Sequence, residues 1–293
     1  MGAERYLVLK GLAGFGDRLL TLARAMELAA ATGRCLVIDW SDASWNHDTV
    51  SPKGFWHYCD LVGLPASVKI VRGDAATWEL LDSLSTDCVA TLPAAFTGAS
   101  RRVDYLLRGG RLCLGDVPVQ VSEKQILAAQ EPVVMYLAYC SGRVEPLLPY
   151  LRLRDAAQHP HATIGVHFRN TDKANSLADI LDRVGRVWRL GRQIWLATDD
   201  VAAIAAFRER FGEDVTGLTP PPRPSSGGGI HHATAAELAT VGTTKERLMF
   251  DMIHDMVALR DCLVFIDSPN SLFSRIVHGM RALRSSLKRG SSE

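Results

Sequence analysis

The stretch YLVLKGLAGFGDRLLTLARAMELAAATG, residues 6–33, carries the pattern that decides the fold. It opens with a short apolar run, 6–9, of the kind found in buried strands. A glycine-rich turn, 11–18, follows, and an apolar stripe with helical spacing overlaps it and runs through 17–32. Gly33 stands where such a helix is expected to end. The stretch therefore predicts a strand, a tight turn and a helix, which is the opening unit of an α/β fold.

The same kind of apolar run recurs along the chain, at 35–40, 133–137, 163–168, 193–197 and 262–266. Each run is continuously hydrophobic rather than alternating, which favours strands of a parallel sheet covered on both faces. A second clear helix is predicted from Thr243, because Thr243 and Glu246 have capping-box spacing ahead of an apolar stripe. The sequence thus predicts an α/β protein built on parallel sheets.

Prolines and histidines interrupt the strand pattern at 147–160, and a new strand is expected directly afterwards. We place a domain boundary in this segment. It gives two Rossmann-like domains, 1–157 and 158–293, with the last helix as a candidate to pack back on the first domain. Ligands of such sheets bind at the carboxyl ends of the strands, so we expect a ligand cleft between the domains.

Composition argues against several classes of function. The formal net charge of the 293 residues is +1 and no block of like charge occurs, so neither a nucleic acid nor an anionic membrane is expected as the main partner. No apolar run approaches the roughly 20 residues of a membrane span, and the first residues lack the pattern of a secretory leader. The six cysteines are scattered and predict neither disulfides nor a zinc site. We expect a cytoplasmic protein with small or neutral partners.

The glycine-rich turn is the first candidate binding site. Gly14 and Gly16 allow backbone N–H groups to approach a ligand, the helix N-terminus behind them favours anions, and Arg18 adds a cation. A tight turn with a purely structural role is the plain alternative. A nicotinamide-nucleotide site is another, because Asp39 ends the next strand where a ribose-binding acid would lie, although Leu19 occupies the third glycine position.

The second candidate site is IGVHFRNTDK, 164–173, where polar groups follow a buried strand. Arg169 has the geometry to bind two phosphate oxygens at once and to stabilise the charge that builds on a departing diphosphate. His167 has a ring that hydrogen-bonds the edge of a base or a sugar. A structural hydrogen-bond network explains the same residues without a ligand.

The third candidate site begins at Asp255 and continues through a strand to Ser268 and Ser271, which open another helix. Their hydroxyls and the backbone amides of the helix start would form a second anion site. Ordinary N-capping of that helix by Ser268 or Ser271 accounts for the two serines equally well.

Taken in order, these segments resemble the NodZ-like fucosyltransferases and, more distantly, the wider superfamily of core α1,6-fucosyltransferases and protein O-fucosyltransferases. The resemblance spans 11–277 and rests on GFGDRLLTLARAMELAAATGRCLVIDW (14–40), IGVHFRNTDK (164–173), IWLATDD (194–200) and DMVALRDCLVFIDSPNSLFSRIV (255–277). It implies a GT-B fold, with 1–157 as the acceptor side and 158–293 as the side of a GDP-sugar donor, whose expected sugar is L-fucose. It also implies inversion at the anomeric carbon, and neither a metal nor a separate cofactor.

The resemblance also implies roles for single residues. Arg169 corresponds to the essential arginine at the β-phosphate of the donor, His167 to a guanine or ribose contact, and Asp255 to the acid that recognises guanine. The remaining residues expected to bind the donor are Gly14, Phe15, Gly16, Arg18, Ser268, Ser271, Phe273 and Ser274.

The chain departs from the family pattern at two places. Asn170 stands where the core fucosyltransferases carry a second arginine, and Leu177 lies near the place of the expected catalytic acid. The candidates for general base are Asp172, Asp179, Asp39 and Asp42, and a mechanism without a strong base stays open.

Two other interpretations stay open beside a glycosyltransferase. One is a binding protein for a GDP-sugar or a glycan that does not catalyse transfer, which Asn170 makes a real alternative; the other is the nicotinamide-dependent enzyme. His231 and His232 follow a proline- and glycine-rich loop and are candidates to touch a ligand, or simply a surface pair. The acceptor is open between a glycan, a lipo-oligosaccharide and a small molecule.

Overall fold

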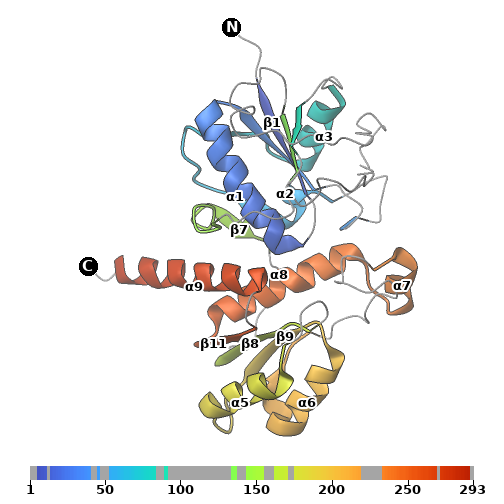
Figure 1. The fold of residues 1–293 in the computed structure, drawn as a ribbon, viewed down its shortest axis with the longest axis vertical. Coiled ribbons are helices and arrows are strands. Elements are labelled where there is room, and N and C mark those ends of the chain that lie inside the picture. The colour runs from blue at the N-terminus through green and yellow to red at the C-terminus, as the bar shows by residue number, and fades with distance from the viewer. Residues whose placement is uncertain are drawn as a thin grey trace. The chain divides into compact units, whose positions relative to one another are not determined.

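The computed structural model describes residues 5–11, 14–40, 45–46, 53–83, 89–91, 133–136, 143–154, 162–170, 175–218, 233–268 and 271–290. The chain divides into two compact units, Met1–Arg152 and Leu153–Glu293, each of which contains its own parallel sheet (Figure 1). The α/β class with parallel sheets is therefore confirmed.

The sheet of the first unit has the strand order β4-β2-β1-β6-β5, and its described pairings are parallel. Its strands are β1 (Tyr6–Lys10), β2 (Cys35–Asp39), β4 (Lys69–Ile70), β5 (Val89–Thr91) and β6 (Val133–Tyr136). A separate pair joins β3 (Cys59–Leu61) to β7 (Leu151–Leu153). β2 is buried along its whole length, as its continuous hydrophobicity predicts.

Three helices accompany this sheet in the described part of the unit: α1 (Phe15–Thr32), α2 (Phe55–Tyr58) and α3 (Asp74–Ser83). α1 packs on β1 and β2. It ends at Gly33, whose positive φ of 63° suits a residue without a Cβ atom, so the predicted stop is confirmed. It starts two residues earlier than predicted, because Gly14 is its N-cap and the N–H of Arg18 already donates to the carbonyl oxygen of Gly14.

The sheet of the second unit has the order β10-β9-β8-β11, all parallel. Its strands are β8 (Ile164–Phe168), β9 (Ile194–Thr198), β10 (Val215–Thr216) and β11 (Val264–Asp267). The strand predicted at 262–266 begins two residues later, because the chain at Cys262 is still leaving the preceding helix. The other predicted strands agree with the structure to within one residue.

The helices of this unit are α5 (Leu177–Val187), α6 (Val201–Phe211), the short 3₁₀ helix η2 (Gly212–Asp214), α7 (Ala235–Thr240), α8 (Lys245–Asp261) and α9 (Leu272–Gly290). The N-cap of α8 lies one residue after the predicted position, because the hydroxyl of Thr244 rather than that of Thr243 accepts a backbone N–H. A capping box is present instead at α7, between Thr234 and Glu237.

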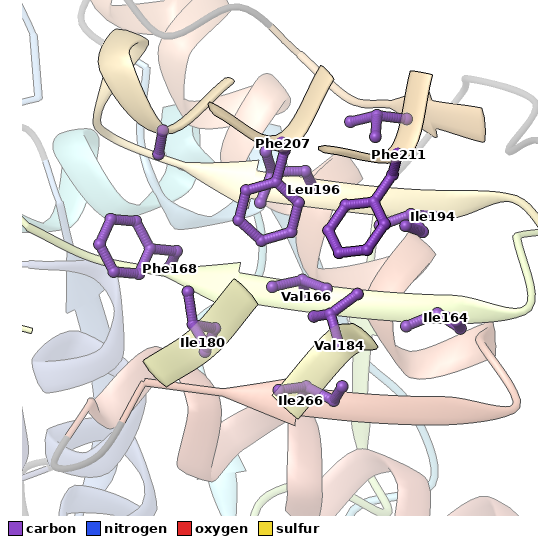
Figure 2. Packing of buried hydrophobic residues seen from close by; sticks show 12 residues of the cluster. Ile164, Val166, Phe168, Ile180, Val184, Ile194, Leu196, Phe207, Phe211 and Ile266 are labelled. Atoms are coloured by element: carbon purple, nitrogen blue, oxygen red, sulfur yellow. The ribbon is translucent and has the colours of Figure 1, made fainter. Parts of the chain in front are cut away.

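The two faces of this sheet carry different side chains. One face buries an apolar cluster against α5 and α6, in which Val166 and Phe168 of β8 meet Ile180 and Phe207 (Figure 2). The other face packs on α8, and it does so closely, because a Cβ atom added at Gly165 would lie 2.9 Å from Cδ2 of Leu259. Alternate residues of β8, His167 among them, therefore face α8.

Two arginines join α9 to the end of α8: Arg284, which bonds to the side chain of Asp261, and Arg281. The guanidinium of Arg281 donates to the carbonyl oxygens of Leu259 and Arg260 at 3.1 Å each, to that of Leu263 at 2.9 Å, and also to that of Cys262. Carbonyl groups at a helix end have no partners within the helix, so a cation there satisfies them and opposes the helix dipole. Arg281 thus fixes α9 against the turn between α8 and β11.

Gly217, which follows β10, offers a direct test of this fold. Its φ is 154°, and an added Cβ atom would lie 2.2 Å from the backbone oxygen of Leu196. We expect Gly217→Ala to lower the free energy of unfolding by about 2–4 kcal/mol, measured by urea denaturation. Gly191→Ala is the control, since Gly191 also has a positive φ of 79° but no heavy atom within 4 Å, and should lose only about 1 kcal/mol. Equal losses would contradict the predicted contact.

Candidate active site

The carboxyl ends of β8 and β11 form the point where the chain order of the second sheet reverses. From β8 the chain continues through α5 to β9 and β10 on one side, whereas β11 pairs with the other side of β8. The helix that follows β8 and the helix that follows β11 pack on opposite faces, because α5 contacts β8 and α9 contacts α8. Ligands of open parallel sheets bind at such a reversal. In the register, His167 of β8 is paired with Asp267 of β11 at this point.

His167 is held in one position by two residues of α9. Its Nδ1 atom lies 2.7 Å from the hydroxyl oxygen of Ser274, and its ring centroid lies 4.6 Å from that of Phe273. The side chain is buried, and this burial, together with the nearby charge of Arg169, lowers the pKa of His167 to about 3. The ring is therefore neutral at physiological pH and acts as a hydrogen-bonding group rather than as a cation.

The backbone of Arg169 is fixed by the buried hydroxyl of Ser268. That hydroxyl donates to the carbonyl oxygen of His167 at 3.1 Å and accepts the N–H of Arg169 at 3.0 Å. The side-chain amide of Asn175 donates to the carbonyl oxygen of Arg169. The guanidinium itself is partly exposed, and its Nε atom lies 4.0 Å from Oδ2 of Asp199. The arrangement presents a cation from a rigid strand end.

Asn170 ties the end of β8 to the end of β9. Its backbone N–H donates to Oδ1 of Asp199 at 2.8 Å, and its side-chain amide donates to Oδ2 of Asp200 at 2.7 Å. Asp200 also caps α6 by accepting the N–H of Ala202. In this chain the position therefore has a structural role, which explains how an amide can stand where the resemblance expects a second arginine.

The start of α9 brings Ser271 and Ser274 next to this strand end. Ser271 accepts the N–H of Ser274 at 3.4 Å, and its carbonyl oxygen accepts the N–H of Arg275 at 3.1 Å. Ser271 therefore has the N-cap position, as one of the two sequence interpretations expected. Both serines are buried. Capping does not exclude anion binding, because the first amides of a helix of this length still favour negative charge.

Asp255 of α8 lies over β9 on the face of the sheet that His167 also occupies. The indole Nε1 of Trp195 donates to its Oδ1 at 2.9 Å, and Trp195 is paired in the register with Gly165, two residues before His167. Burial raises the pKa of Asp255 to about 8. The carboxyl is thus protonated in much of the protein at neutral pH, and a partner that donates hydrogen bonds would stabilise its ionised form.

Three comparisons with known proteins bear on this arrangement. No family model matches the sequence, and no curated protein does either. Among solved structures, NodZ α1,6-fucosyltransferase co-crystallised with GDP superimposes with a TM-score of 0.56 at 21% identity, over 94% of this chain and 92% of that one. The chain has the NodZ fold. The NodZ structure from Bradyrhizobium gives a TM-score of 0.55 at 20% identity over the same shares, and POFUT1 in complex with GDP-fucose gives 0.59 at 14%, over 96% and 95%.

Within this NodZ fold, the glycine-rich turn of the first unit is packed more tightly than its sequence suggests. Arg18 is 1% exposed, and its guanidinium carbon lies 5.4 Å from the ring centroid of Trp40. It fits there because Gly11 lacks a Cβ atom, which would lie 2.2 Å from Nη1 of Arg18. Phe15 is also buried, whereas Gly14 and Gly16 are partly exposed. In this conformation Arg18 packs against Gly11 and Trp40 and does not present its charge at the surface.

The candidate general bases differ in what the structure says of them. Asp39 is 1% exposed at the end of β2, so its carboxylate has almost no surface to offer to a substrate or to the ribose of a nicotinamide nucleotide. Asp179 is exposed in the first turn of α5. Asp42 and Asp172 lie outside the described residues, as do His231 and His232.

None of the described helices combines the length and the apolar composition needed to cross a membrane. In the same part of the chain, no three histidine, cysteine or acidic side chains gather as a group able to hold a metal ion.

Sequence reasoning missed three residues that shape the site: Asn175, Trp195 and Asp199. Asp199 had a signal, because it lies two residues after a predicted strand whose carboxyl end adjoins that of β8. Trp195 had none, since it is one of several apolar residues in the β9 run, and only the structure shows its indole bound to Asp255.

The contact between His167 and Ser274 yields a stability prediction. In Ser274→Ala, Nδ1 of the buried ring loses its hydroxyl partner, so we expect the free energy of unfolding to fall by about 1–3 kcal/mol. Ser286→Ala is the matched control on α9, because Ser286 is exposed and its hydroxyl bonds only to a carbonyl oxygen of its own helix. Chemical denaturation of the three proteins checks this, and equal stability of all three would contradict it.

Proposed function

We propose that the chain is an inverting glycosyltransferase that transfers a sugar, expected to be L-fucose, from a GDP-sugar to a hydroxyl group of a glycan or small-molecule acceptor. The observation that carries the proposal is the cluster of His167, Arg169 and Ser274 at the reversal point of the second sheet, with Asp255 on the same face. The likeness in fold to fucosyltransferases crystallised with GDP and GDP-fucose supports it.

The diphosphate end of the donor is assigned to Arg169 and to the start of α9. A guanidinium binds phosphate oxygens through two parallel hydrogen bonds, and the first amides of a long helix favour an anion. Ser268 and Asn175 fix the backbone of Arg169 before any ligand arrives, which sets the point from which its side chain extends. Such preorganised donors stabilise a leaving diphosphate more effectively than mobile ones, because no reorganisation is needed during the reaction.

The guanine end is assigned to Asp255 and His167. The guanine edge carries adjacent N–H donors, which a single carboxylate accepts together. Asp255 already accepts one N–H, that of the Trp195 indole, in a buried environment. His167 is neutral and offers a ring that bonds or stacks without adding charge.

The proposed reaction is a single displacement. The acceptor oxygen attacks the anomeric carbon from the face opposite the diphosphate, the bond from that carbon to the diphosphate oxygen breaks, and GDP leaves with the electron pair. The proton of the acceptor passes to a base, for which Asp179 and Asp172 are the candidates, or to water. Arg169 balances the charge on the departing diphosphate. Holding both partners in line supplies much of the rate.

The test is isothermal titration of the purified protein with GDP, UDP and NAD. We expect GDP to bind and UDP and NAD to bind far more weakly, since only guanine matches Asp255. Release of fucose from GDP-fucose, with and without a broad panel of glycan acceptors, then separates a transferase from a protein that only binds the nucleotide. Preference for NAD, or no binding of GDP, would overturn the proposal.

A further inference from the structure

A pocket of about 350 Å³ opens beside the candidate donor site, on the α5 side of the second sheet. Its base is apolar, formed by Phe168 and Ile180, and Ser268 lies at its edge. Its rim consists of polar residues before and along α5: Asn175, Ser176, Asp179, Asp182, Arg183 and Arg186. Ser268 is shared with the expected donor site, whereas the donor residues on α8 and α9 lie on the other face of the sheet and do not line this pocket.

The charges on the rim balance, and two of them are committed to the fold. Asp182 pairs with Arg210 at 2.8 Å, and Arg183 donates to the carbonyl oxygen of Asp267 at 2.8 Å. The side chains of Asp179 and Arg186, by contrast, have no ion pair among the described residues. They are seven positions apart on α5, so they lie on the same face of the helix. The pocket thus offers one available acceptor and one available donor of hydrogen bonds.

This chemistry fits a neutral sugar ring. A pyranose has an apolar face of C–H groups and an edge of hydroxyls that both donate and accept, which matches an apolar base with a carboxylate and a guanidinium at the rim. A free anion gains no net attraction from this rim, because the two acids, Asp179 and Asp182, balance the two arginines. The volume is near the lower end of the range for small-molecule pockets, about 300–1,000 Å³, which suits one or two sugar units rather than a long glycan.

We propose that this pocket holds a neutral pyranose unit of the acceptor, with Asp179 and Arg186 hydrogen-bonded to its hydroxyls. The assignment rests on the proposed function, because it names the acceptor site of that same transferase. Ser268 connects the two sites, because its hydroxyl holds the backbone of Arg169 and the residue also lines the pocket. An acceptor seated there lies next to the strand end that binds the departing diphosphate.

The test uses methyl glycosides of neutral hexoses and N-acetylhexosamines as probes of the whole protein, with saturation-transfer NMR to detect binding and titration to measure it. We expect at least one glycoside to bind the native protein and to bind about fivefold or more weakly to Asp179→Asn and to Arg186→Gln. Glu209→Gln and Arg208→Gln on α6 are the matched controls, because both residues are exposed and lie outside the pocket.

The GDP titration, run on the same proteins, separates failure of this inference from failure of the proposed function. GDP binding without any glycoside binding, or glycoside binding that the pocket variants and the α6 variants affect equally, would overturn the pocket assignment alone. Binding of inorganic phosphate in the pocket, lost in Arg186→Gln, would also overturn it and make the pocket an anion site. Absence of GDP binding would overturn the proposed function itself.

Discussion

Replacing Arg169 with alanine is expected to lower kcat/KM for transfer from GDP-fucose by about 10²- to 10³-fold, the largest effect of any single change that we predict. The reason is that the guanidinium is assigned to charge that grows as the diphosphate departs, so its loss should reduce kcat more than GDP affinity. Steady-state kinetics and a GDP titration on the same variant measure both quantities. Arg169→Lys should recover only part of the rate, since an ammonium group cannot bind two phosphate oxygens side by side.

Arg208→Ala provides the control for the loss of an arginine in this unit, because Arg208 is exposed on α6 and lines no part of the site. It should leave kinetics and GDP affinity close to those of the native protein. Equal rates for Arg169→Ala and the native protein would remove Arg169 from the mechanism. A loss of folded structure is not expected, because Ser268 and Asn175 hold the backbone of this residue and not its side chain.

The second large effect concerns Asp255 and pH. Because burial raises the pKa of this carboxyl to about 8 and guanine needs the ionised form, GDP affinity should rise as the pH is raised from about 6 to about 8, by up to about tenfold per pH unit. In Asp255→Asn, GDP affinity should be at least about tenfold lower at pH 8, and this pH dependence should disappear. Titration of both proteins with GDP across this range measures the effect.

Stability of the ligand-free protein should respond to pH in the opposite direction. The unfolded chain releases the proton of Asp255 near its ordinary pKa of 3.8, whereas the folded protein keeps it until about pH 8. Between these values the folded state binds more protons, so this group's contribution to stability falls as the pH rises. Asp255→Asn should remove that loss, because a neutral amide oxygen still accepts the N–H of Trp195. A variant less stable than the native protein at pH 8 would contradict this account.

Much of the fold could be predicted from the sequence, because the strands of a parallel sheet that is covered on both faces appear in the sequence as continuous apolar runs. β8 and β9 are buried on both faces, so nearly every residue in them is apolar and the runs stand out. The first residues of the helices were harder to predict from the sequence. Thr243 and Thr244 are neighbours with the same side chain, and only the geometry of the first turn decides which one accepts the N–H of Arg247.

The candidate site could be predicted in part. His167 and Arg169 stood out because polar residues that directly follow a buried strand need a reason to be there. The burial of Arg18 could not be predicted in the same way, because an arginine in a glycine-rich turn is typical of an anion-binding site. Its burial beside Trp40 depends on the space that the absence of a Cβ atom at Gly11 leaves. Burial is set by tertiary neighbours, which local sequence does not contain.

The contacts of Arg281 affect the spacing between α8 and α9. By joining the end of α8 to α9, Arg281 helps to fix the spacing between the helix that carries Asp255 and the helix that Ser271 caps and whose first turn carries Ser274. On the proposed function, α8 binds the guanine base and the start of α9 binds the phosphates. The distance between the two helices therefore determines which length of phosphate chain fits. The protein should then bind GDP more tightly than GMP and GTP. Removing the contacts of Arg281 should reduce this difference in affinity while leaving the preference for guanine in place.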